Sequence, residues 1–268
     1  MFKKRLISGI ILLVITILLV VTGGNLLFAF TLFISLIGLM ELYRVVDMNK
    51  KIPAIFGYIF TLGHYGLIYF NMEDHILSLV ILFLLLLMTF YVFSFPKYKT
   101  EDIAIVFFGL FYVSILLSYI YQVRVLDDGA ILIWLVFIGA WGSDTCAYCV
   151  GMLFGKHKLF PKLSPKKSTE GHIGGVVGAA LIGFIFGAIF QDSIIAVNNP
   201  RLAFTIICGV SSLLSQIGDL AASAIKRNYE IKDYGRLIPG HGGILDRFDS
   251  ILFTAPVVYY LTHLFIIK

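Results

Sequence analysis

Basic residues, carboxylates and glycines are concentrated in one stretch of this 268-residue chain, residues 223–249. The stretch reads SAIKRNYEIKDYGRLIPGHGGILDRFD, and long apolar runs precede and follow it. A charged side chain in hydrocarbon costs roughly 2.5 to 3.5 kcal/mol, so charged groups beside such runs usually face a polar cavity and have a function. The stretch is therefore the first place to look for chemistry.

Four carboxylates are expected to meet at one depth. Polar residues before and within the stretch recur at helical spacing and form one stripe: Ser212, Ser215, Gln216, Asp219, Ser223 and Lys226. Asp246 and Asp249 stand three residues apart in the first turn of the following helix, and Asp144 lies in the corresponding half of an earlier one. Capping of a helix dipole would explain one of these acids, but not all four.

Clustered carboxylates repel one another unless a cation or a proton intervenes. Oxygen ligands favour Mg²⁺, so we expect Asp144, Asp219, Asp246 and Asp249 to be its ligands, with room for a second cation left open. A proton or ion relay is the alternative. The cysteines, Cys146, Cys149 and Cys208, have no second ligand pair for zinc and are interpreted as core thiols.

The basic residues predict a phosphate-binding surface opposite these acids. They are Lys166 and Lys167 in SPKKSTEG, followed by Lys226, Arg227, Lys232, Arg236 and Arg247. Mixed with acids, they fit a polyphosphate bridged by metal. Pro239 to Gly243 (PGHGG) precedes a helix, where backbone amides can meet phosphate oxygens. Binding of anionic lipid by the basic loops, and a simple glycine turn, are the plainer alternatives.

The elements that must position these groups are membrane-spanning helices. Hydrophobic residues make up 59% of the chain and the mean hydropathy is +0.93. The sequence predicts an all-α polytopic membrane protein of about nine spans: 6–22, 26–43, 53–70, 76–94, 103–121, 130–154, 173–190, 202–224 and 248–267. We expect one membrane domain, 1–268, with apolar scaffold helices in 1–121 and catalytic helices with two polar loops in 122–268. Glu41 and Arg44 are expected to pair locally, and His64 to be a packing residue.

Charge placement predicts the orientation. Of the 21 Lys and Arg residues, all but Arg124, Arg201 and Lys268 fall in connections on one side. The positive-inside rule places that side, with the N-terminus and both polar loops, in the cytoplasm, and the C-terminus outside. This distribution also explains the net charge of +5 without any nucleic-acid partner.

The stretch closely resembles the signature of the phosphatidate cytidylyltransferase (CDP-diacylglycerol synthase) family. The matching positions are Ser223, Lys226, Arg227, Lys232, Asp233, His241, Gly242, Gly243, Asp246, Arg247 and Asp249, with upstream matches at Ser143 to Thr145, Ala147, Tyr148, Phe154 to Lys156, Ser164 to Lys167, Glu170 and Gly171. The resemblance covers roughly the C-terminal half.

The resemblance implies a multi-span, generally dimeric enzyme of phospholipid biosynthesis in the cell membrane. It would convert CTP and phosphatidate into CDP-diacylglycerol and pyrophosphate with Mg²⁺. Asp219, Asp246 and Lys167 would be the catalytic residues. Substrate binding would fall to Lys166, Lys167, Ser223, Lys226, Arg227, Lys232, His241, Gly242, Gly243 and Arg247.

Three other functions stay open at this point. A lipid kinase that uses CTP would transfer the γ-phosphoryl group and release CDP. An ion-coupled transporter would also place acids in the membrane, although no inverted repeat is visible. A noncatalytic anchor for anionic lipid explains the basic loops but gives Asp219 no role.

Overall fold

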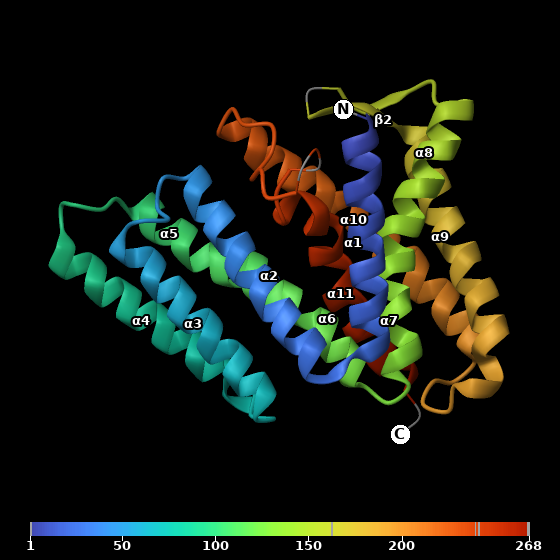
Figure 1. The fold of residues 1–268 in the computed structure, drawn as a ribbon, viewed down its shortest axis with the longest axis horizontal. Coiled ribbons are helices and arrows are strands. Elements are labelled where there is room, and N and C mark those ends of the chain that lie inside the picture. The colour runs from blue at the N-terminus through green and yellow to red at the C-terminus, as the bar shows by residue number, and fades with distance from the viewer. Residues whose placement is uncertain (1, 162, 239, 241, 267–268) are drawn as a thin grey trace.

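The computed structural model describes residues 2–161, 163–238, 240 and 242–266. The described residues form a helical bundle, with a small hairpin at one end (Figure 1). The helix α1 begins at that end and α11 ends at the opposite one. The helices are α1 (Phe2–Thr22), α2 (Gly24–Val45), α3 (Ile52–Tyr69), α4 (Ile76–Ser94), α5 (Thr100–Gly109), α6 (Leu116–Val125), α7 (Gly129–Phe137), α8 (Ser143–Phe154), α9 (Thr169–Phe190), α10 (Pro200–Asn228) and α11 (Leu245–Phe265).

Seven helical segments among the described residues are long and apolar enough to cross a membrane, and they coincide with the predicted second to eighth spans. The prediction of a polytopic membrane protein is confirmed. The first and last predicted spans are also helices. The described apolar part of the first is short, Ile7–Thr22. The last, α11, starts with Asp246, Arg247 and Asp249 and contains Pro256, so its charged first turns interrupt the apolar run.

Two spans contain π-helical segments that the apolar pattern did not indicate. Leu110–Ile115 joins α5 to α6, and η3 (Ile138–Gly142) joins α7 to α8. In η3, a side chain on Gly139 would collide with the hydroxyl of Ser211 on α10. The wider turn and the missing side chain together let this span approach α10 closely.

A β-hairpin that the sequence analysis did not predict forms between α8 and α9. Its antiparallel strands are β1 (Lys158–Phe160) and β2 (Ser164–Ser168). Glu170 in the first turn of α9 fastens the hairpin, since its carboxylate accepts hydrogen bonds from the amides of Lys156 and His157 and contacts the His157 ring at 2.6 Å. The hairpin therefore has a fixed position over the start of α9.

Small residues bring α9 against its neighbours. The buried residues of this helix are Gly171, Gly175, Ala179, Gly183 and Gly187, one per turn along a single face. Side chains at these glycines would meet the backbone of α8 at one end and of α10 at the other. Such a stripe permits close helix contact in a membrane, where apolar burial alone gives little attraction between helices.

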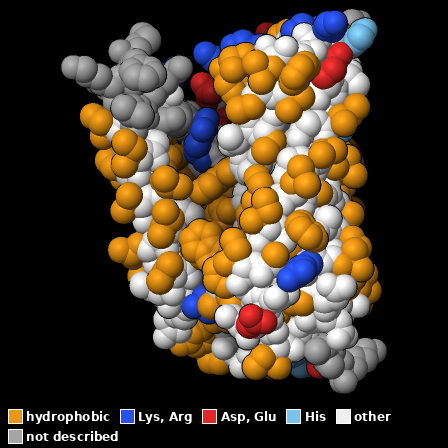
Figure 2. All heavy atoms as spheres, turned by 90° about the vertical axis from the view of Figure 1, so that its right-hand side faces the viewer, with side chains coloured by type: hydrophobic (Ala, Val, Ile, Leu, Met, Phe, Trp, Pro, Cys, Tyr) orange, Lys and Arg blue, Asp and Glu red, His pale blue; other side chains and the backbone are white. Residues whose placement is uncertain are grey.

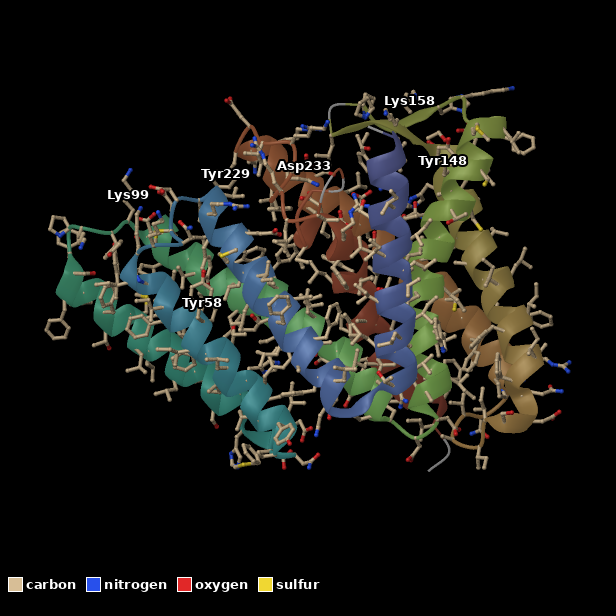
Figure 3. The ribbon with its side chains drawn as sticks, viewed as in Figure 1. Tyr58, Lys99, Tyr148, Lys158, Tyr229 and Asp233 are labelled. Atoms are coloured by element: carbon tan, nitrogen blue, oxygen red, sulfur yellow. The ribbon has the colours of Figure 1, made fainter. Side chains whose placement is uncertain are left out.

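Several connections rich in Lys and Arg lie at one end of the bundle. Figure 3 places Lys99, Lys158 of the hairpin and Asp233 of the loop after α10 at the same end. Much of the flank is apolar, as Figure 2 shows, and α4 exposes large side chains such as Leu77 and Phe93. This distribution suits a protein surrounded by lipid.

Candidate active site

Asp219 and Lys167 form an ion pair at the charged end of the bundle. The Nζ atom of Lys167 lies 2.5 Å from Oδ2 of Asp219, and both side chains are about two-thirds to three-quarters buried. Lys167 of β2 is partly buried and reaches Asp219, whereas its neighbour Lys166 is exposed. The hairpin thus places Lys167, one of the two predicted lysines, in contact with the predicted acid Asp219.

Asp144 and Asp249 complete a cluster of three carboxylates around this pair. Asp144 begins α8 and Asp249 lies in α11, and both are within electrostatic range of Asp219 on α10. Because one lysine faces three acids, the cluster has an excess of negative charge that would attract a cation.

A cavity of about 430 Å³ opens beside the cluster, between α8, the hairpin, α9 and α10. Its lining includes Asp144, Lys166, Lys167, His172 and Gln216. The amide of Gln216 donates to the His172 carbonyl and to the Ser143 hydroxyl, which joins α10 to α9 and α8. The volume lies in the range of small-ligand pockets, and its polar wall holds both signs of charge.

Asp246 has a different environment from the other three acids. Its Oδ1 accepts from Nζ of Lys226 at 2.8 Å, and its Oδ2 accepts from the amides of Tyr234 and Gly243 at 2.8 and 2.9 Å. The side chain is only 3% exposed. In this structure Asp246 holds the loop between α10 and α11 and pairs with the predicted phosphate ligand Lys226.

Tyr234 is the buried centre of that loop, and sequence reasoning did not find it. Its hydroxyl donates to the carbonyl of Ala222 at 3.1 Å, and the ammonium of Lys226 lies 5.4 Å from its ring centroid. Burial, with added repulsion from Tyr112 and Asp246, raises the pKa of the Tyr234 phenol far above its usual value. The phenol therefore stays protonated and keeps donating its hydrogen bond.

The glycines of the loop serve close packing. Gly242 has a φ of +84°, and a side chain there would collide with the Asp246 carboxylate. Gly243 donates its amide to that carboxylate, and its α-carbon faces Glu41 of α2. His241 and Pro239, predicted to take part in this turn, lie outside the described residues.

Glu41 and Arg44 both hydrogen-bond the chain around the loop before α11, and among the described residues they form no ion pair with each other, contrary to the predicted local pairing. Oε2 of Glu41 accepts from the amide of Leu245 at 3.0 Å, and Nη2 of Arg44 donates to the carbonyl of Tyr234 at 2.7 Å. These contacts join residues about 200 positions apart in the chain, so local spacing gave no sign of them. His64 is buried and contacts Ser118 at 3.0 Å, as expected of a packing residue.

The remaining predicted site residues lie around the cluster but apart from the ion pairs described above. Ser223 lies half-buried on α10 between Asp219 and Lys226, and Arg227 is exposed in the last turn. Lys232 and Arg247 line a second cavity, of about 500 Å³, on the outer side of the loop. The structure thus gathers acids and two lysines on the inside and leaves several cations facing water.

Over residues 3–265 the sequence matches the cytidylyltransferase family. This chain belongs to the cytidylyltransferase family. The match spans both the helices that carry the acid cluster and the N-terminal helices, for which only hydrophobicity had been recognised.

Curated relatives agree with that family over nearly their whole length. The chain is 33% identical over 275 residues to a phosphatidate cytidylyltransferase of Bacillus subtilis, covering 98% of each protein. It is 35% identical over 265 residues to the phosphatidate cytidylyltransferase of Staphylococcus saprophyticus, covering 97% of this chain and 98% of the relative. The cytidylyltransferase resemblance inferred from the C-terminal motif is confirmed for the whole chain.

The acid cluster of this cytidylyltransferase offers the oxygen ligands that a cation site needs. Its side chains are not already arranged around a cation position. Carboxylate oxygens are the donors that Mg²⁺ prefers. Across the part of the chain that the structure describes, no three His, Cys, Asp or Glu side chains are arranged ready to hold a metal. The oxygens of Asp219 and Asp246 contact lysine ammonium groups instead.

Proposed function

We propose that this chain is a phosphatidate cytidylyltransferase, which joins CTP to phosphatidate and releases pyrophosphate. Its family, its full-length relatives and the acid cluster with Lys167 support the assignment. The single observation that carries the site is that Asp144, Asp219 and Asp249, from three helices, lie within electrostatic range of one another beside a lysine-lined cavity. An anchor for anionic lipid would need no such group of acids.

In the proposed reaction, a phosphate oxygen of phosphatidate attacks the α-phosphorus of CTP. A new P–O bond forms there, the bond to the bridging oxygen of the β-phosphate breaks, and pyrophosphate leaves with that electron pair. No protein nucleophile is needed, so the protein orients the two anions and offsets their charge. Lys166 and Lys167 stand at the cavity wall where they can bind the triphosphate and the leaving pyrophosphate.

A divalent cation, Mg²⁺ in our proposal, would be held by Asp219 with Asp249 and Asp144, and would neutralise part of the charge of the triphosphate. Asp246 can join this ligand set only if Lys226 leaves its Oδ1. The two lysines and a cation compete for the same carboxylates. We therefore expect Lys167 and Lys226 to be free for phosphate oxygens in the loaded enzyme, together with Ser223, Arg227 and His241.

The lipid can approach from the side of the bundle. A cleft of about 280 Å³ lies between Leu12, Leu13 and Thr16 of α1 and a wall formed by Trp141, Arg247 and Phe248. Figure 2 shows a hollow along this flank with basic side chains inside its upper part. Arg247 and Phe248 lie between Asp246 and Asp249 in sequence, so the cleft borders the first turn of α11 that carries both acids. We propose that phosphatidate keeps its acyl chains in this cleft and presents its phosphate near Arg247.

We further propose that nine helices cross the membrane and that the charged end faces the cytoplasm, where CTP is available. A homodimer is also expected from the resemblance. A molecular mass of the purified detergent complex that corresponds to one chain would contradict the dimer.

The activity is tested with purified protein in detergent, phosphatidate, CTP and Mg²⁺. We expect CDP-lipid and pyrophosphate in equal amounts, no product without divalent cation, and at least about a hundredfold loss in Asp219→Asn, since a charged ligand is removed. Glu73→Gln, a change at an exposed acid before α4, should leave the rate unchanged. Full turnover of Asp219→Asn would refute the role of this acid, and no CDP-lipid from the wild-type protein would refute the function.

A further inference from the structure

The cytoplasmic-side end of α2, within the half predicted to be a scaffold, contacts the loop that carries the site. Glu41 is only 1% exposed, and its carboxylate accepts a hydrogen bond from the amide of Leu245, where α11 begins. Side chains on Gly235 or Gly243 would collide with this carboxylate. Glu41 is therefore enclosed by loop backbone on several sides.

The burial of the Glu41 carboxylate beside the start of α11 has a physical explanation. Burying a charge is costly unless it is paired or hydrogen-bonded, and the amides of a helix N-terminus offer both donors and the positive end of the dipole. Glu41 supplies from another helix the acceptor that a capping residue would otherwise provide. Arg44, one turn further along α2, adds a hydrogen bond to the Tyr234 carbonyl at 2.7 Å.

The loop is consequently held from two sides by two carboxylates. Asp246 binds the amides of Tyr234 and Gly243 from within α11, and Glu41 binds the start of α11 from α2. Gly243 touches both acids. A shift of α2 would move the first turn of α11, which bears Asp246, Arg247 and Asp249.

We propose that Glu41 is a positioning residue for the transferase site, because its carboxylate fixes the first turn of α11 and so the relative placement of Asp246 and Asp249. This inference rests on the proposed function. It gives the N-terminal half a direct part in the geometry of the active site, through a residue that contacts neither substrate.

The test compares Glu41→Ala and Glu41→Gln with Asp47→Asn. Asp47 is a matched control, since its carboxylate follows the same helix end but is 97% exposed and paired only with Lys51. Two quantities are measured in detergent: kcat and KM for CTP, and the rate of tryptic cleavage after Arg236, an exposed loop residue. Cleavage after Lys99, in a different connection, serves as the reference.

We expect Glu41→Ala to lower kcat/KM about 10- to 100-fold, the range for loss of hydrogen bonds to a charged group, mainly through kcat. Cleavage after Arg236 should accelerate while cleavage after Lys99 does not change. Glu41→Gln keeps an acceptor for the Leu245 amide and should restore part of both properties. Asp47→Asn should match the wild-type protein.

Several results would overturn the inference. One is normal kcat/KM and normal cleavage in both Glu41 variants. Another is equal acceleration at Arg236 and Lys99, which would show a general loss of stability. If Glu41→Ala does not fold, Glu41→Gln decides by the same measurements. A wild-type protein without transferase activity would refute the proposed function, and the cleavage comparison would still decide whether Glu41 holds the loop.

Discussion

At the scale of single residues, two acids of the site form ion pairs with lysines. Asp219 pairs with Lys167 and Asp246 with Lys226, each lysine coming from a different segment. The sequence predicted these four residues as functional from type and spacing. It predicted the lysines as phosphate ligands only, because nothing in a local pattern says which acid a lysine on a distant loop will meet.

The Lys226–Asp246 pair gives a stability prediction at this scale. Both side chains are largely buried, so Lys226→Met, which leaves the carboxylate without its partner, should lower the free energy of unfolding by about 3 to 5 kcal/mol. The double variant Lys226→Met/Asp246→Asn removes both charges and should lose less than the two single changes added together. Unfolding by sodium dodecyl sulfate in mixed micelles measures this coupling.

Additive losses in that double-mutant cycle would contradict the pairing. Asp47→Asn, at an exposed acid, gives the baseline.

At the scale of elements, apolar runs located the helices well, since a span is defined mainly by length and hydrophobicity. They could not show the π-helical turn at Gly139, where the chain lies close to Ser211 of another helix. The hairpin was missed because its two strands are short, basic and partly exposed, with no alternating apolar pattern. The hydrogen bond between Glu41 and the first turn of α11 was not predicted, because it depends on how distant helices pack.

The close contact of α9 with α10 predicts which glycines can be replaced. A side chain at Gly183 would collide with the carbonyl of Phe204, so Gly183→Ala should cost about 1 to 3 kcal/mol of stability and broaden or lower the thermal transition. Gly66 of α3 has open space around it, and Gly66→Ala should be neutral or slightly stabilising. Equal transitions for the two variants in detergent would disprove the tight contact.

At the scale of the whole molecule, the proposed site would bring a soluble nucleotide and a membrane lipid to one polar layer of the bundle. The hairpin and the loop before α11 lie at the same end, and the cleft beside α1 is lined in part by Arg247 and Phe248 of the first turn of α11. The placement of Lys and Arg along the sequence predicts which side of the membrane this end faces. The positive-inside rule concerns insertion of the chain, so the packing of the helices does not test it.

Orientation is tested with single cysteines in a variant whose three native cysteines are replaced. Lys158→Cys lies on the hairpin and Asp192→Cys after α9, at the opposite end of that helix, and both native residues are exposed. With a membrane-impermeant maleimide on intact cells, we expect Asp192→Cys to react and Lys158→Cys to react only after lysis. The reverse pattern would place the charged end outside.

The position of the transferred phosphorus tests the central claim most directly. Purified protein receives phosphatidate, Mg²⁺ and CTP labelled on either the α- or the γ-phosphorus. A cytidylyltransferase places the α-label in the lipid product and the γ-label in pyrophosphate. Transfer of the γ-label to lipid with release of CDP, or no transfer of either label, would contradict the account.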